Sequence, residues 1–170
     1  MKFITLALTF FFLIACGGGS SSGVSTIHFG TYDGYARMTL RIAGSNFSDT
    51  AYGSVVFVIY KNGAVVSDPG APFQGNGSMD GDTMVANVPG SAFNDEDFTC
   101  AGSIRFQGDI ENGVIKGNIS SSSFRCNNVN FVTTGTFTAY KRNTAKQDQT
   151  PALGLLAKRI QDQARLSQAN

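Results

Sequence analysis

The residue types that most often carry out catalysis are scarce in this sequence. His28 is the single histidine among 170 residues, so a Ser–His or Cys–His mechanism would depend on it alone. No nucleophile pattern lies near it, and we interpret His28 as a surface histidine at the start of the first strand. A zinc site needs three or four nitrogen or sulfur ligands, which one histidine and a disulfide-bonded cysteine pair (argued below) cannot supply. We therefore predict no enzyme, no catalytic residue and no metal ligand.

Two acidic clusters could do chemistry of another kind: Asp80-Gly81-Asp82 and Asp95-Glu96-Asp97. Carboxylates on loops can bind Ca²⁺, and a pair of them can hydrolyse a glycosidic bond. Neither cluster has the full ligand spacing of a calcium loop, and the chain contains no tryptophan that could support a sugar. Exposed acidic turns are the interpretation we favour, with calcium binding as the alternative.

The third candidate is Cys16, which follows a short apolar segment. Lys2, the apolar residues 3–12 and the small Ala15 have the layout of a secretory signal peptide over residues 1–15. The segment is too short to span a bilayer, which takes about 20 residues. Leu13-Ile14-Ala15-Cys16 resembles the lipobox of bacterial lipoproteins. The resemblance implies cleavage between Ala15 and Cys16, a thioether-linked diacylglycerol on Cys16, and an N-acyl chain on the new amino terminus.

Residues 16–23 are almost entirely glycine and serine and predict a flexible tether between lipid and fold. This context separates the lipobox interpretation from an ordinary signal peptide followed by a chance cysteine. Two or three acyl chains are enough for stable anchoring. In the enterobacterial sorting pattern an aspartate after the cysteine retains lipoproteins at the inner membrane. Gly17 occupies that position here, so the resemblance implies the outer membrane of a bacterial cell envelope, with the leaflet left open.

With Cys16 assigned to lipid, Cys100 and Cys126 remain. In an exported chain such a pair predicts a disulfide, because the periplasm and the exterior are oxidising. Closing a loop of that length would add about 3–4 kcal/mol to the free energy of unfolding. Two buried free thiols are the alternative.

Residues 24–140 predict one antiparallel β domain. Met38, Leu40 and Ile42 alternate with polar residues, which is typical of a half-buried strand. Asn62-Gly63 and Asn112-Gly113 each separate two apolar runs and predict type I′ hairpins. The remaining strands are expected at 54–60, 64–66, 82–88, 104–107, 114–119 and 129–140, and the glycine-rich residues 69–81 are expected to form a long loop. The fold class is therefore mainly β: a small antiparallel meander barrel, or a sandwich, of about eight strands.

Gly30-Thr31-Tyr32 and Gly135-Thr136-Phe137 are alike, and residues 108–119 add a second pattern of turn glycines. In these features the chain resembles calycin-like barrels of bacterial surface lipoproteins, including the barrel lobes of transferrin-binding lipoproteins. The resemblance implies that the first and last strands pair and so remove the sheet edges.

Four phenylalanines are expected to face inward: Phe57, Phe106, Phe131 and Phe137. An eight-stranded barrel either fills with side chains or holds one small ligand. The many large residues favour a filled interior. The alternative is that these four rings line a site for a small apolar ligand.

The chain changes character after residue 140. Residues 141–149 form a polar linker, and residues 150–168 predict an amphipathic helix that Thr150 caps and that Pro151 begins. The apolar face comprises Leu153, Leu156, Ala157, Ile160, Ala164 and Ser167. We favour docking of this face on an open end or edge of the barrel. The alternatives are helix-in-groove binding of another protein through Leu153, Leu156 and Ile160, or contact with a membrane surface.

Together these features predict an envelope-anchored lipoprotein that acts as a non-enzymatic binding or assembly module at the outer membrane. Anchoring would raise its effective concentration toward its partner, which we expect to be another envelope protein. No nucleic acid is expected, and the lipid on Cys16 is the only predicted prosthetic group. Carriage of a small apolar ligand inside the barrel is the alternative function.

Overall fold

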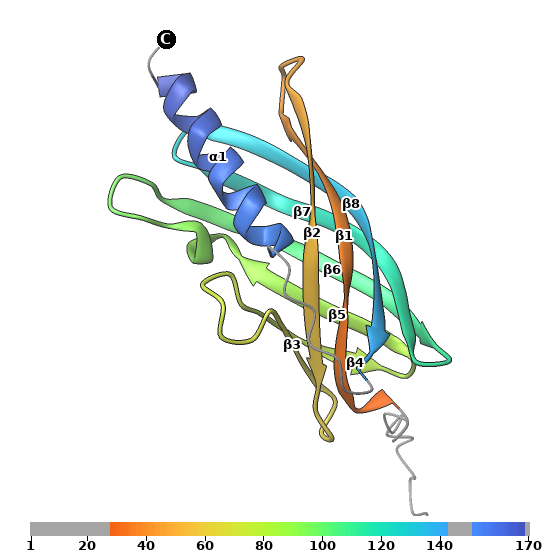
Figure 1. Ribbon diagram of the computed structural model, residues 1–170. Helices are drawn as coiled ribbons and strands as arrows, with labels where there is room; N and C mark the ends of the chain where they lie inside the picture. The colour runs from red at the N-terminus through yellow and green to blue at the C-terminus, as the bar shows by residue number, and fades with distance from the viewer. Residues whose placement is uncertain (1–27, 143–150, 169–170) are drawn as a thin grey trace, which may run out of the picture.

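The computed structural model describes residues 28–142 and 151–168, and within them the chain forms one closed antiparallel barrel with a helix against it (Figure 1). The strands follow one another around the barrel in chain order, and β1 pairs with β8 to close it. They are β1 (Gly30–Ile42), β2 (Ser48–Ile59), β3 (Ala64–Ser67), β4 (Gly75–Asp80), β5 (Thr83–Pro89), β6 (Cys100–Glu111), β7 (Val114–Cys126) and β8 (Val129–Lys141). A 3₁₀ turn, η2 (Gly90–Phe93), follows β5, and α1 (Ala152–Gln168) is the helix. The predicted mainly β meander is confirmed, as a barrel and not a sandwich.

The core lies inside the barrel because the strands alternate between apolar and polar residues. On β1, Met38 and Leu40 are fully buried, while Arg37 and Arg41 are exposed. On β5 the same period buries Met84, Ala86 and Val88. A side-chain period of two places every second residue on one face of a strand, so these local patterns decide which face points inward.

One strand was not predicted. The glycine-rich residues 69–81 were expected to form a loop, but β4 occupies Gly75–Asp80 and pairs with both β3 and β5. A Cβ on Gly77 would overlap the carbonyl oxygen of Val85 on β5. Glycine is therefore required at this position because the two strands approach closely. The glycine-rich segment, whose composition is typical of a loop, forms a strand for this reason.

The first Asn-Gly turn also differs from its prediction. Asn112 and Gly113 both have positive φ, as a type I′ hairpin requires. Between β2 and β3 only Gly63 has positive φ, 80°, and its N–H donates to the carbonyl oxygen of Tyr60 (2.9 Å). The N–H of Tyr60 also donates to the carbonyl oxygen of Ala64 (2.9 Å). Residues 61–63 therefore form a three-residue loop with glycine at its left-handed position.

The barrel wall beside β2 is completed by several different elements. β3 is short and pairs only with residues 57–59 of β2. Next along the same edge, Asp68 exchanges hydrogen bonds with Val56, and Pro151 then forms a parallel bridge with Ser54. Beyond them α1 lies beside the upper half of β2, as Figure 1 shows. Each device covers backbone groups that an open edge would expose.

The helix is therefore part of the barrel's core. Gly53 leaves space for it, since a Cβ there would lie 2.5 Å from the Cα of Ala152. The buried residues of the helix are Ala152, Leu153, Leu156, Ala157, Ile160 and Ala164. Docking of the apolar face against an edge is thus the arrangement present, except that Ser167, expected on that face, is exposed.

Candidate binding surface

Tyrosines on the outside of the barrel mark the most distinctive surface of this chain. Of the five tyrosines, Tyr32 is buried, and the other four are exposed: Tyr35 (46%), Tyr52 (63%), Tyr60 (48%) and Tyr140 (54%). Large exposed apolar rings are informative when they gather on one face. All four lie on, or directly after, the neighbouring strands β2, β1 and β8.

The register of these strands brings side chains from distant parts of the sequence together. Arg37 lies opposite Tyr52 on β2 and opposite Thr136 on β8. Tyr35 lies opposite Ser54 and Thr138. We call Tyr35, Arg37, Tyr52, Thr136 and Thr138 the tyrosine wall. A groove of about 370 Å³ runs along it, with Ala36, Gly53 and Phe137 as its other lining residues.

Arg37 gives the wall a positive charge next to an aromatic ring. Its guanidinium carbon lies 5.6 Å from the centroid of Tyr52, within the range of a cation–π contact. Within residues 28–142 and 151–168, neither Arg37 nor Arg41 forms an ion pair, whereas Arg142 pairs with Asp33 and Arg159 with Asp49. Tyrosine and arginine are the residue types that dominate binding energy at protein interfaces.

The interior offers less room for binding. Phe57, Phe106 and Phe137 are buried and contact one another, with ring centroids 5.7, 5.1 and 5.7 Å apart. Phe131 packs instead on Phe124, at 6.4 Å. Three of the four rings expected to line a ligand site therefore pack directly against one another, with no room for a ligand between them.

His28 is not the surface residue we expected. Only 4% of it is exposed, and its Nε2 lies 2.6 Å from Oδ1 of Asp82 in the β4–β5 turn. Its carbonyl oxygen accepts a hydrogen bond from the hydroxyl of Tyr32 (3.0 Å). The sequence alone does not show whether a histidine just before a strand is buried or exposed. Burial of His28 depends on its contact with Asp82, in a turn 54 positions away.

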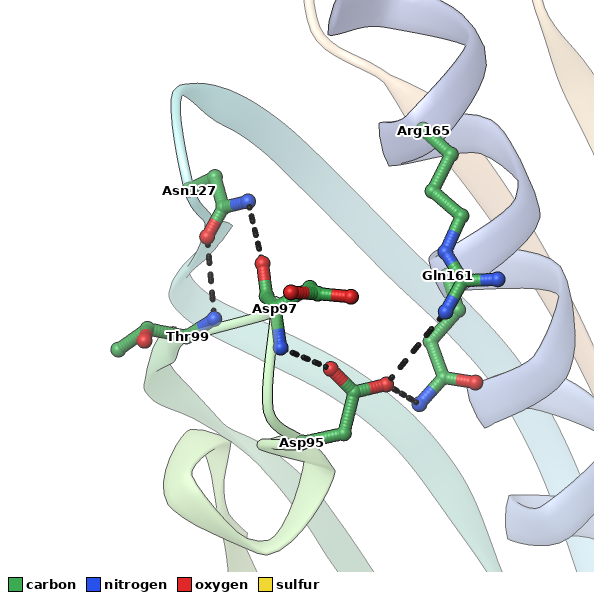
Figure 2. Close-up of polar contacts among 6 residues, drawn as sticks. All are labelled: Asp95, Asp97, Thr99, Asn127, Gln161 and Arg165. Carbon is green, nitrogen blue, oxygen red and sulfur yellow. Dashed lines mark hydrogen bonds and ion pairs between the residues drawn. The ribbon is translucent and has the colours of Figure 1, made fainter.

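The acidic cluster at 95–97 is tied to the helix, as Figure 2 shows. Asp95 accepts hydrogen bonds from the backbone N–H of Asp97 (3.0 Å) and from the side-chain amide of Gln161 (3.1 Å). Arg165 approaches the same carboxylate at 3.9 Å. Asn127 supports the loop from the β7–β8 turn. In the part of the chain that the structure describes, no three His, Cys, Asp or Glu residues are grouped so as to hold a metal ion.

The predicted disulfide is present. Cys100 and Cys126 face each other in the β6–β7 register, with a Cα–Cα distance of 4.0 Å and bonded sulfur atoms. The bond joins the first residue of β6 to the last residue of β7. It therefore closes the open end of this hairpin, opposite its Asn112-Gly113 turn.

The alternative of helix-in-groove binding requires Leu153, Leu156 and Ile160 to be accessible to a protein partner. All three have no exposed surface and pack within the barrel's core, so with the helix docked they are not available to a groove on another protein. No helix within residues 28–142 and 151–168 is long and apolar enough to cross a bilayer.

The signal peptide, the cleavage site at Ala15 and Cys16, the tether and most of the polar linker lie outside the described residues. The tyrosine wall was missed, although the sequence holds a signal for it. Tyr35 and Arg37 alternate with the inward-facing Ala36 and Met38, so their outward direction was readable. Their proximity to Tyr52 and Thr136 was not. Comparison of the sequence with protein-family models and with curated proteins gives no match.

Proposed function

We propose that this chain is a lipid-anchored binding module of the bacterial outer membrane, which recognises another envelope protein through the tyrosine wall. Cys16 would carry the lipid, and the Gly/Ser residues after it would let the barrel reach its partner. Confinement near the membrane raises the effective concentration of the two proteins toward each other. The role is non-enzymatic: the barrel supplies a rigid surface.

The observation that carries this proposal is the contrast between inside and outside. Inside, the rings of Phe57, Phe106 and Phe137 are in mutual contact. Outside, Tyr52 is 63% exposed beside Arg37, over a groove of about 370 Å³. Binding energy is therefore available on the outer wall, where aromatic rings and a guanidinium already lie in place on paired strands.

Crosslinking in intact envelopes tests the partner. The variant Tyr52→Ser with Arg37→Gln removes the ring and the charge without touching the core. We expect at least a tenfold loss of crosslinked partner, because truncating central tyrosine and arginine residues each costs about 2 kcal/mol or more. The matched control is Gln107→Ser with Arg105→Gln, an exposed and hydrogen-bonded pair on β6, which should keep the partner. Equal yields from the two variants would assign binding to another surface.

The anchor has its own test. Cys16→Ser should leave a protein that is not labelled by radioactive palmitate and that leaves the membrane fraction. Labelling and fractionation identical to the unaltered chain would contradict lipidation at Cys16, while leaving the tyrosine wall untouched.

A further inference from the structure

Asp68 occupies an unusual position at the point where β3 leaves β2. Its backbone N–H donates to the carbonyl oxygen of Val56 (2.7 Å), and its Oδ1 accepts the N–H of the same residue (2.9 Å). Its backbone is left-handed, with φ of 45°, and Pro69-Gly70 follow in a turn closed by a bond from Ala71 to Asp68 (3.1 Å). The carboxyl group is thus held in a fixed direction.

The second oxygen of this carboxyl group lacks a partner. Only 5% of Asp68 is exposed, and within the described residues its Oδ2 accepts no hydrogen bond. A buried carboxylate without full pairing is costly. Burial accordingly raises the pKa of Asp68 to about 6. Above that pH the carboxyl group is negatively charged and its Oδ2 can accept a hydrogen bond.

Two adjoining hollows meet at this group. A small one of about 120 Å³ is lined by Asp68, Ser54 and Asp33 among others. A larger one of about 370 Å³ has an apolar floor, made by Val56, Val58, Pro69, Ala71 and Pro151. Val56, Asp68 and Pro151 line both. Asp68 therefore borders both a small hollow that includes Asp33 and Ser54 and a larger one with an apolar floor.

The surrounding charges favour a cation. Asp33 is paired by both its oxygens with Arg142, which itself lines the larger hollow. These two charges cancel, and the charge of Asp68 is left over. A ligand that offers a donor with positive charge next to a short apolar chain matches both hollows at once.

We propose that Asp68 anchors a binding site for a small organic ammonium ion, whose apolar chain lies on Val56 and Val58. The ammonium group donates to the carboxyl group of Asp68 and neutralises its charge, and the larger hollow takes the alkyl chain out of water. The hollows extend over β1 at Thr31 and Asp33 and adjoin the tyrosine wall at Ser54, the register partner of Tyr35. No residue of the tyrosine wall lines them, so the site does not depend on the proposed function.

The test uses n-butylammonium as the probe and n-butanol, a neutral molecule of the same shape, as its control. Both are titrated at pH 7.5 into the detergent-solubilised full-length protein, and the amide resonances of Val56 and Asp68 are followed. We expect the ammonium probe to shift them and to bind about tenfold or more tightly than the alcohol, since only the ammonium probe forms a hydrogen bond between charged groups.

Two variants locate the site. Asp68→Asn keeps an oxygen for the N–H of Val56 but removes the charge, and it should abolish the preference for butylammonium over butanol. Asp80→Asn, on the exposed end of β4, should change nothing. Equal binding of the two probes to the unaltered protein overturns the proposal even if Asp68→Asn fails to fold, and so does a preference that survives in that variant.

Discussion

At the scale of single residues, Asp68 extends the pairing of β2 beyond the end of β3. Its backbone N–H donates to the carbonyl oxygen of Val56, and its carboxyl group accepts the N–H of Val56, as a strand residue's carbonyl would. The same placement buries the carboxyl group, and desolvation disfavours its charged form. The pKa of about 6 is thus a consequence of completing the ladder.

This pKa predicts a pH-dependent stability. An acid whose pKa is higher in the folded state binds its proton more tightly there, so protonation stabilises the fold as the pH falls through about 6 toward 3.8. We expect the free energy of unfolding, taken as the unaltered protein minus Asp68→Asn, to rise by roughly 2 kcal/mol between pH 7 and pH 4. Urea unfolding at both pH values measures it. Subtracting the variant removes contributions common to both proteins, such as loss of the Asp33–Arg142 pair. A difference that does not change with pH would show that Asp68 titrates normally.

At the scale of elements, the amphipathic helix replaces barrel wall. β2 is 12 residues long, but β3 has four and pairs with only three of them. The helix buries its apolar face over the part that remains. Arg159 pairs with Asp49 on β2, and Gln161 bonds to Asp95 at the other side of the gap. α1 thus spans from one edge of the opening to the other.

If α1 is an integral part of the barrel wall, truncating a side chain on its buried face should destabilise the whole barrel. We expect Leu156→Ala to lower the free energy of unfolding by about 2–5 kcal/mol, in a single cooperative transition. Lys158→Ala, exposed on the same helix, should change it by less than about 0.5 kcal/mol. Tryptic digestion and urea unfolding distinguish the two. A Leu156→Ala protein of unchanged stability would mean that the helix is an independent appendage.

The contact at Gly53 provides a second test of the same element. A side chain there meets the backbone of Ala152, which cannot move without lifting the first turn of α1. We expect Gly53→Val to expose the helix to protease and to promote binding of a hydrophobic dye, while Thr50→Val, further along β2, leaves both unchanged. A helix that stays protected in Gly53→Val would show that β2 and α1 can separate without loss of docking.

At the scale of the whole molecule, the barrel has two distinct ends. The described chain begins at the end where His28 contacts the β4–β5 turn, the lower end in Figure 1. The helix runs toward the opposite end, where Cys100 and Cys126 join β6 to β7. Hydrogen bonds fix the end nearest the predicted tether, and a covalent bond fixes the far end.

We expect Cys100→Ser with Cys126→Ser to lower the free energy of unfolding by about 3 kcal/mol, the loop entropy that the disulfide removes from the unfolded chain. Equilibrium unfolding with and without reductant measures it, because reductant should destabilise proteins that keep the Cys100–Cys126 bond and leave the double variant unchanged. Cys16→Ser serves as the control with both cysteines retained. Equal stability under oxidising and reducing conditions would show that the bond contributes nothing to the fold.

Much of this architecture follows from local patterns. The alternation around Met38, the helical spacing of Leu153, Leu156 and Ile160, and the Asn112-Gly113 turn all predicted their elements correctly. The failures have long-range causes. β4 was not predicted because the need for Gly77 arises from its close approach to β5. His28 was wrongly predicted to be exposed because its burial comes from a contact with the distant Asp82. Asp68 precedes Pro69-Gly70, a sequence typical of an exposed turn, so nothing local marks its carboxyl group as buried.

What the sequence determined by itself is the direction of each side chain relative to its own element, because a period of 2 or 3.6 is a property of neighbouring residues. It thereby determined the inward phenylalanines, the outward tyrosines and the apolar face of the helix. Only the tertiary structure decided which of these meet. Closure of the barrel set Arg37 between Tyr52 and Thr136, packed the phenyl rings on one another and placed α1 in the gap beside β2. Those contacts join residues far apart in the chain, and their pairing depends on the register of every strand between them.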